Sequence, residues 1–205
     1  MTTAVTSRVT LVPDAFSLVE FDAAELIGVV ERVLDAVGID DPVRLEIDET
    51  TPLGWARVVS SDPIVLELES GALEDPKRLL HLSPTGAAAV LGRLLSRVRD
   101  RRDPVFCDPV APPPDRELSL AQSSAWDAYG CGRLVRLGFR HHDDRERRRY
   151  HFRIRHGFTD ASDVAFDALW AGEGLTWADI ERLSAAASPE PSRGTATDSS
   201  EHVVG

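Results

Sequence analysis

The sequence predicts an α+β fold, with an N-terminal helix and a second long helix on a small antiparallel sheet, then a mostly helical module with one basic β-hairpin. Three observations support this class. An apolar stripe has helical spacing, several segments alternate between apolar and polar residues, and residues 103–115 are rich in proline. We therefore expect an α+β module over residues 1–102, a joint over 103–115, a helical module with the hairpin over 116–187 and a disordered tail over 188–205.

The first helix is expected from about Ala23 to Val37, because both of its ends carry the usual signals. Asp22 can cap the first turn, Glu25 stands where a capping box needs a carboxylate, and Gly38 ends the helix. The apolar positions recur at helical spacing and form one stripe: Leu26, Ile27, Val30, Val33, Leu34 and Val37.

Three short β-segments follow, over residues 43–49, 55–59 and 64–69. The first and third alternate cleanly between apolar and polar residues, which is typical of strands with one buried and one solvent-exposed face. We expect an antiparallel meander with an acidic exposed face formed by Glu46, Asp48, Glu67 and Glu69.

Two proline signals then predict helix starts. Asp75-Pro76 favours a short helix that ends near Leu82, and Ser83-Pro84 precedes a longer helix from Thr85 to Arg102. Beyond the proline-rich joint, further helices are expected over residues 117–137, 160–170 and 176–186, the first of them interrupted by Gly130 and Gly132.

The net charge of −11 is unevenly distributed. Nine arginines lie between Arg133 and His156 against three acidic residues, so this segment carries +6 and the rest of the chain carries −17. A basic island in an acidic chain indicates a surface that binds anions.

The basic island contains the predicted hairpin, with strands over residues 139–142 and 148–155 and a polar turn over 143–147. Tyr150, Phe152 and Ile154 would point to one side of the second strand. The basic side is the candidate binding site, and its residues are Arg136, Arg140, Arg149, His151, Arg153 and Arg155.

Guanidinium groups on one face can hold phosphates or carboxylates through paired hydrogen bonds. We therefore expect a non-enzymatic binding protein that engages an anionic macromolecule, a protein in preference to a nucleic acid. The alternative interpretation is a solvated strand whose arginines pair with acidic residues of the same chain.

A second alternative comes from the run Gly132-Arg-Leu-Val-Arg-Leu-Gly-Phe-Arg-His-His-Asp-Asp-Arg-Glu-Arg-Arg-Arg-Tyr, after which Phe158-Thr-Asp-Ala-Ser leads into a helix. It resembles the end of the recognition helix and the Asp-x-Arg-x-Arg wing of the multiple-antibiotic-resistance regulator family of winged-helix proteins. The resemblance covers residues 132–170 and implies a DNA-binding transcriptional regulator.

The order of elements over residues 22–102 also looks like the layout of small zincin metallopeptidases. Their metal-binding His-Glu-x-x-His motif is replaced here by Thr85-Gly-Ala-Ala-Ala-Val-Leu-Gly-Arg, which offers neither a ligand nor a general base. If the scaffold is related, its zinc chemistry is absent.

The other common signatures are absent from the sequence. The histidines lack metal-ligand spacing, Cys107 and Cys131 show no nucleophile signature, and no phosphate-binding loop occurs. No stretch approaches the roughly 18 apolar residues of a membrane span. We therefore expect a cytoplasmic protein without metal or cofactor, and the rival of a different class is a hydrolase whose site is assembled from scattered residues.

Overall fold

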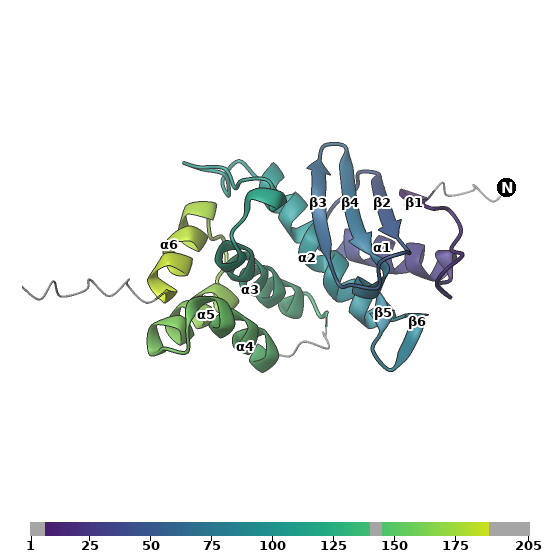
Figure 1. Cartoon of the computed structure of the whole chain (residues 1–205). Helices are drawn as coiled ribbons and strands as arrows, with labels where there is room; N and C mark the ends of the chain where they lie inside the picture. The colour runs from purple at the N-terminus through teal and green to yellow at the C-terminus, as the bar shows by residue number, and fades with distance from the viewer. Residues whose placement is uncertain (1–6, 140–144, 189–205) are drawn as a thin grey trace, which may run out of the picture.

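A computed structural model describes residues 7–139 and 145–188, and their fold is α+β as the sequence predicts (Figure 1). The first half contains β1 (Val9–Val12), α1 (Ala23–Val37), β2 (Val43–Asp48), β3 (Ala56–Ser61), β4 (Ile64–Glu69), β5 (Glu74–Asp75), β6 (Arg78–Leu82) and α2 (Pro84–Arg102). The second half contains α3 (Leu120–Arg136), α4 (Arg145–His156), α5 (Asp160–Ala171) and α6 (Trp177–Ala187). Two short 3₁₀ turns, η1 (Ser70–Ala72) and η2 (Asp115–Glu117), complete the described elements.

The main sheet is mixed, which corrects the predicted antiparallel meander. Its strand order is β1-β2-β4-β3, and β2 runs parallel to both β1 and β4. The β3–β4 hairpin of this sheet is antiparallel, and β4 lies between β2 and β3. Alternation along a strand identifies its buried face but not its neighbour, because both pairing directions have the same two-residue period.

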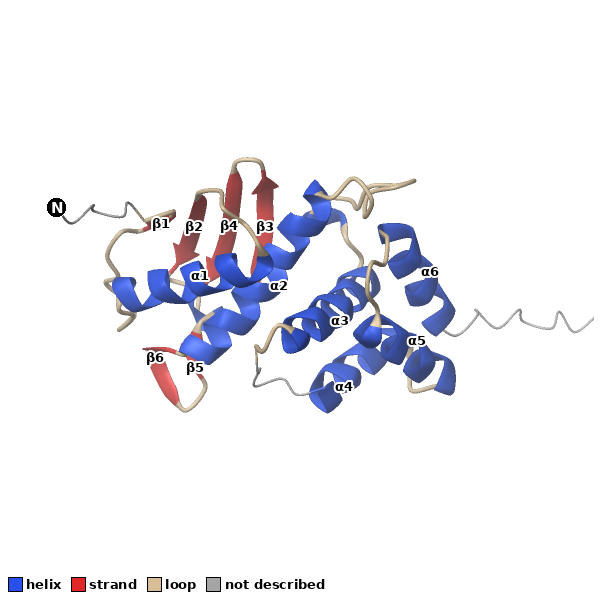
Figure 2. Cartoon of the chain, turned by 180° about the vertical axis from the view of Figure 1, so that it is seen from behind, coloured by secondary structure: helices blue, strands red, loops and turns tan. Residues whose placement is uncertain are grey.

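Helices α1 and α2 cover one face of this sheet, as the views from opposite sides in Figures 1 and 2 show. The alternating apolar residues of β2 and β4 point to these helices and are buried, which confirms the predicted inward face. Two of the three predicted signals at the ends of α1 are also present, whereas the Glu25 side chain does not complete the predicted capping box. Asp22 accepts hydrogen bonds from the backbone N–H groups of Ala24 and Glu25, and Gly38 ends the helix at φ 73°.

The predicted helix over residues 75–82 is wrong, because this segment forms the β5–β6 hairpin (Figure 1). Asp75 accepts a hydrogen bond from the backbone N–H of Lys77 at 2.8 Å, which closes a turn around Pro76. The carboxylate of Glu74 accepts the N–H of Leu80 at 3.1 Å, and Leu80 adopts φ 65°. Side chains that close turns compete with helix formation in this way.

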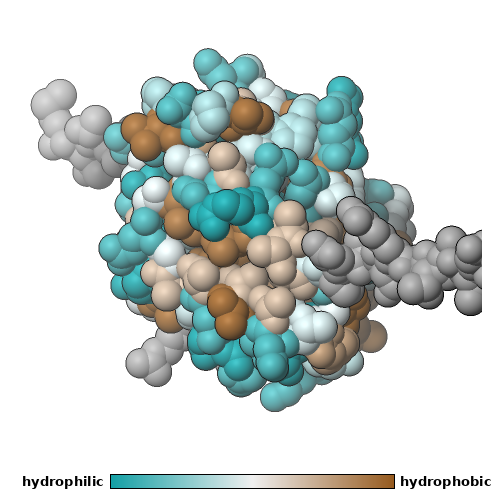
Figure 3. All heavy atoms as spheres, turned by 90° about the vertical axis from the view of Figure 1, so that its left-hand side faces the viewer, coloured by the Kyte–Doolittle hydropathy of each residue, from teal (hydrophilic) through white to brown (hydrophobic). Residues whose placement is uncertain are grey.

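The helical module has its own apolar core, which includes Trp126, Phe152, Phe166 and Trp177. Figure 3 looks onto the outer end of this module, where tan, mildly hydrophobic residues lie below the centre of the view next to teal, hydrophilic ones. Helix α3 also connects the two cores, because its Leu134 belongs to the core around the sheet.

The two glycines of α3 do not interrupt it. Gly132 is required for packing, since a Cβ atom there would lie 2.0 Å from the carbonyl oxygen of Trp170 at the end of α5.

The predicted basic β-hairpin is wrong where it is described, because Arg145–His156 forms helix α4. Its buried residues Arg148, Phe152 and His156 have the four-residue spacing of a helix. Arginine is a good helix former, and Ile154 is the one β-branched residue of this run.

The described part of residues 132–170 therefore contains no strand that could serve as the wing of a winged-helix protein. Arg140 and the turn over 140–144 lie outside the described residues, as does the expected disordered tail from residue 189 onward. No described helix combines the length and apolar character needed to cross a membrane.

Candidate anion-binding site

A hollow of about 320 Å³ lies where α2, α3 and α4 meet. Its apolar lining consists of Leu120 and Ile154, and its polar lining consists of Arg93, Ser123, Ser124, Asp127, Arg148, His151 and Arg155. Three arginines and a histidine therefore surround a hollow in which one carboxylate is present. This lining has a surplus of positive charge in a chain whose net charge is −11.

A buried ion-pair network centred on Arg97 lies next to the hollow. The guanidinium of Arg97 donates from Nη1 to Asp115 Oδ2 at 3.1 Å and from Nη2 to Asp127 Oδ1 at 2.7 Å. Its Nη2 atom also donates to the hydroxyl oxygen of Ser123 at 2.9 Å. Arg97 therefore fixes α3 and η2 against α2, and it orients two residues that line the hollow.

Asp127 lies among three guanidinium groups. Besides Arg97, the nearest nitrogens of Arg93 and Arg148 lie 3.6 Å and 3.8 Å from its Oδ2 atom. Burial alone would raise the pKa of Asp127, but the positive charges of the three arginines outweigh burial and lower it. Asp127 is therefore ionised at neutral pH, and it is the only acidic group in the lining of the hollow.

Two of the six predicted binding residues, His151 and Arg155, line this hollow. They lie one helical turn apart on α4, opposite Arg93 of α2 and the two serines of α3. Within the described chain, neither side chain makes an ion pair or a hydrogen bond. Their polar atoms can thus bind a ligand without breaking an internal contact.

Three of the other four predicted residues make internal contacts. Arg136 donates to the carbonyl oxygens of Trp170 at 2.8 Å and Gly172 at 2.7 Å, where it satisfies the end of α5. Arg149 pairs with Asp167 at 2.6 Å, and Arg153 pairs with Asp163. Arg140 is the sixth predicted residue and lies outside the described residues.

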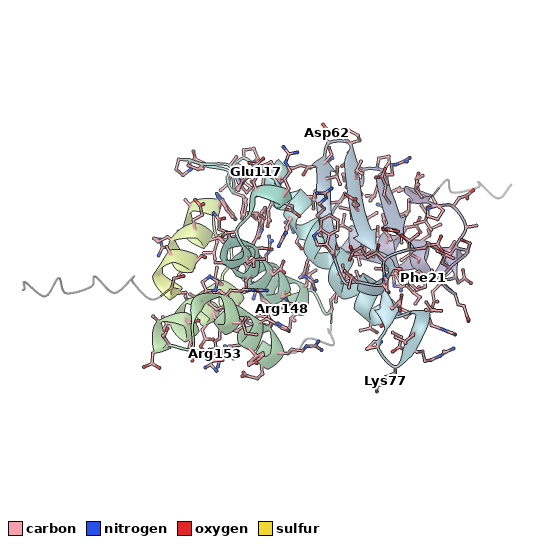
Figure 4. All side chains as sticks on the ribbon, in the orientation of Figure 1. Phe21, Asp62, Lys77, Glu117, Arg148 and Arg153 are labelled. Carbon is pink, nitrogen blue, oxygen red and sulfur yellow. The ribbon has the colours of Figure 1, made fainter. Side chains whose placement is uncertain are left out.

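Figure 4 labels Arg148 and Arg153 on different sides of α4, with Arg148 toward α3 and Arg153 toward the outer edge of the module. The ion pairs agree with this view, because Arg148 approaches Asp127 of α3 and Arg153 contacts Asp163 of α5. The basic segment therefore has one side that packs against α5 and another that lines the hollow.

Sequence reasoning missed the contributions of α2 and α3 to the site. Arg93 and Arg97 have i,i+4 spacing on a helix that was correctly expected, and Asp127 falls on the next one. The sequence did contain a signal for this contribution. Charged residues on the inward side of a helix predict ion pairs with the neighbouring helix, because a buried charge needs a partner.

A second hollow, of about 340 Å³, lies near the C-terminal ends of α2 and α3. Two of its three arginines are occupied, since Arg133 binds Asp100 through two hydrogen bonds of 2.7 Å and 2.6 Å and Arg136 binds backbone carbonyls. Arg99 makes no ion pair or hydrogen bond within the described residues, and three acidic residues, Asp100, Asp103 and Glu173, share this lining. This hollow therefore offers fewer groups to a ligand than the first.

The pair His156–Ser184 has the spacing of a general base and a nucleophile, with Nε2 and Oγ 2.9 Å apart. However, both side chains are buried, and the Nδ1 atom of His156 lies 3.1 Å from the carbonyl oxygen of Phe152 instead of a carboxylate. Burial lowers the pKa of His156, so the ring is neutral at pH 7. The pair connects α4 to α6 and is closed to a substrate.

Across residues 7–139 and 145–188, no three His, Cys, Asp or Glu side chains gather in a geometry that could hold a metal ion. Comparison with known proteins finds no match, whether to a family model, a curated protein or a solved structure.

Proposed function

We propose that the chain is a non-enzymatic binding protein whose hollow between α2, α3 and α4 receives an anionic group of a partner protein. The observation that carries the proposal is the convergence of His151 and Arg155, which have no internal polar partner among the described residues, with Arg93 and Arg148. A lining with three guanidinium groups and one carboxylate is complementary to an anion.

The shape of the basic surface supports a protein partner over duplex nucleic acid. Nucleic-acid binding depends on several phosphate contacts along a backbone. Here Arg145, Arg149 and Arg153 pair with acidic residues of α5, so these arginines of α4 do not extend the basic lining of the hollow into a continuous track.

The test uses a decaglutamate peptide as an anionic probe, with binding followed by fluorescence anisotropy at low salt. The double variant His151→Gln/Arg155→Gln removes the two unpaired groups, and we expect it to weaken binding at least about tenfold, equivalent to about 1.4 kcal/mol. Arg153→Gln is the matched control, because it removes a positive charge from the same helix but outside the hollow.

Unchanged binding by the double variant, or equal losses in the double variant and the control, would overturn the proposal. A duplex DNA probe provides a further arm. If the DNA binds more tightly than the peptide and loses affinity in the double variant, the partner is a nucleic acid instead of a protein. Binding should then depend steeply on salt concentration.

A further inference from the structure

The charge of the hollow suits a dianion better than a single carboxylate. Its lining contains three arginines and one aspartate, and His151 adds a further positive charge when protonated. A carboxylate carries one negative charge, whereas a phosphate monoester carries about −1.5 to −2 at pH 7. A bound phosphate monoester would therefore neutralise the positive charge of the lining more completely than a carboxylate would.

The donors of the hollow also come from three directions. The hydroxyl oxygen of Ser123 already accepts a hydrogen bond from Arg97, so the hydroxyl hydrogen is available to a ligand. Arg93 on α2 and Arg155 on α4 provide guanidinium donors from the other two helices. Three directions of approach match the three terminal oxygens of a phosphate monoester, whereas a carboxylate offers two.

An apolar strip begins at the rim of the hollow and leads away from it over α4 and the residues that follow it. The strip consists of Ile154, which lines the hollow and is 47% exposed, Tyr150 one turn earlier, which is 55% exposed, and Phe158, which is 64% exposed. The rings of Tyr150 and Phe158 are in edge contact, with centroids 5.9 Å apart. Across the hollow, Leu120 of α3 is 64% exposed.

The strip extends beyond the hollow, whose 320 Å³ lies at the lower end of the range for small-molecule sites, roughly 300–1,000 Å³. A peptide with an anionic side chain beside apolar side chains would cover both the basic hollow and the apolar strip. Exposed apolar side chains next to a polar site are typical of interaction surfaces.

We propose that the anionic group is the phosphate monoester of a phosphorylated side chain in the partner, and that apolar residues next to it bind the strip. This inference rests on the proposed function, since it names the ligand of the same hollow.

The experiment uses three peptide libraries with random flanking positions and a central phosphoserine, glutamate or serine. We expect the phosphoserine library to bind at least about tenfold more tightly than the glutamate library, and the serine library not to bind measurably. Arg155→Gln should remove this preference while Arg153→Gln retains it. Sequencing of the bound peptides should show apolar flanking residues, and Ile154→Ser should remove that enrichment.

The outcomes separate this inference from the proposed function. Equal binding of phosphoserine and glutamate libraries, lost in both cases on Arg155→Gln, would overturn the phosphate while the anion-binding function stands. Binding of none of the libraries would overturn both. Phosphoserine binding without apolar enrichment, displaced fully by millimolar inorganic phosphate, would overturn the phosphorylated partner in favour of a small phosphate compound.

Discussion

Two interfaces of the helical module use the same residue types in different surroundings. Where α2 packs against α3 and η2, arginines pair with Asp100 and Asp115, whose side chains are each 4% exposed. Between α4 and α5, arginines pair with Asp167, whose side chain is 50% exposed. Removal of one partner from a buried ion pair leaves the other charge buried and unpaired, which is strongly destabilising. At the surface, water solvates the remaining charge and the loss is small. The first interface therefore depends on its ion pairs, and the second depends mainly on its apolar core.

The largest expected effect is at Arg97. Arg97→Ala leaves the carboxylates of Asp115 and Asp127 without their shared partner, and we expect the free energy of unfolding to fall by about 3–5 kcal/mol. Urea unfolding followed by circular dichroism measures this change. Arg116→Ala is the control, because the Arg116 side chain is exposed and should change stability by less than about 0.5 kcal/mol. A loss at Arg97 as small as that at Arg116 would show that water reaches the buried carboxylates.

A pair of glycines in α3 sharpens the comparison of the two sides of this helix. An alanine Cβ at position 132 would lie 2.0 Å from the backbone oxygen of Trp170, and the overpacking should cost about 1–3 kcal/mol or more. At position 130 the nearest such atom is Ser96 Cβ at 3.9 Å, an ordinary contact. Gly130→Ala should therefore stabilise the protein by up to about 1 kcal/mol through helix propensity.

Thermal unfolding of both variants, monitored at 222 nm, tests this expectation. Equal effects of the two substitutions would mean that α5 moves away from α3 without cost.

The sequence predicts the elements that carry their own local signals. The prediction of α1 is confirmed, because its capping residues and its apolar stripe indicate the same helix. The predicted inward face of β2 is also confirmed, because alternation specifies which side of a strand is buried. Strand pairing in the sheet could not be predicted, since the placement of β4 beside β2 depends on the whole topology.

The α4 segment shows why the lining of the candidate hollow was predicted only in part. Its alternation of basic and apolar residues favoured a strand, but helical burial at Arg148, Phe152 and His156 decided the fold. His151 and Arg155 line the same hollow, since i,i+4 residues share a face in a helix just as alternate residues do in a strand. Arg149 and Arg153 were separated from them by pairing with α5, which no local pattern reveals.

A pH-dependent contribution is expected from His156. Because burial lowers the pKa of His156 in the folded state, the unfolded chain binds the proton more readily. The contribution of His156 to stability is full above the ordinary imidazole pKa of about 6.5 and declines as the pH falls below that value. His156→Gln should give a flatter stability profile between pH 7 and pH 5, measured by urea unfolding at each pH.

The reference for His156 is the variant His151→Gln, since His151 lies at the surface of the hollow and its ring is not buried. A profile for His156→Gln that is as steep as the wild-type profile would assign the pH dependence to another group.

The smallest expected effect is at the α4–α5 interface. Arg145 binds Asp167 at 2.8 Å, and their side chains are 42% and 50% exposed, so water screens the pair. A double-mutant cycle with Arg145→Ala and Asp167→Ala should give a coupling of about 0.2–1 kcal/mol, which decreases at 1 M NaCl because the Debye length falls to about 3 Å.

Arg149 also binds Asp167 at 2.6 Å, so Asp167→Ala alone should cost more than Arg145→Ala alone. A coupling of 3 kcal/mol or more, insensitive to salt, would mean that this interface is as dry as the one between α2 and α3. In that case the ion pairs of both interfaces would contribute similarly to stability. The difference between buried and exposed ion pairs in this module would then disappear.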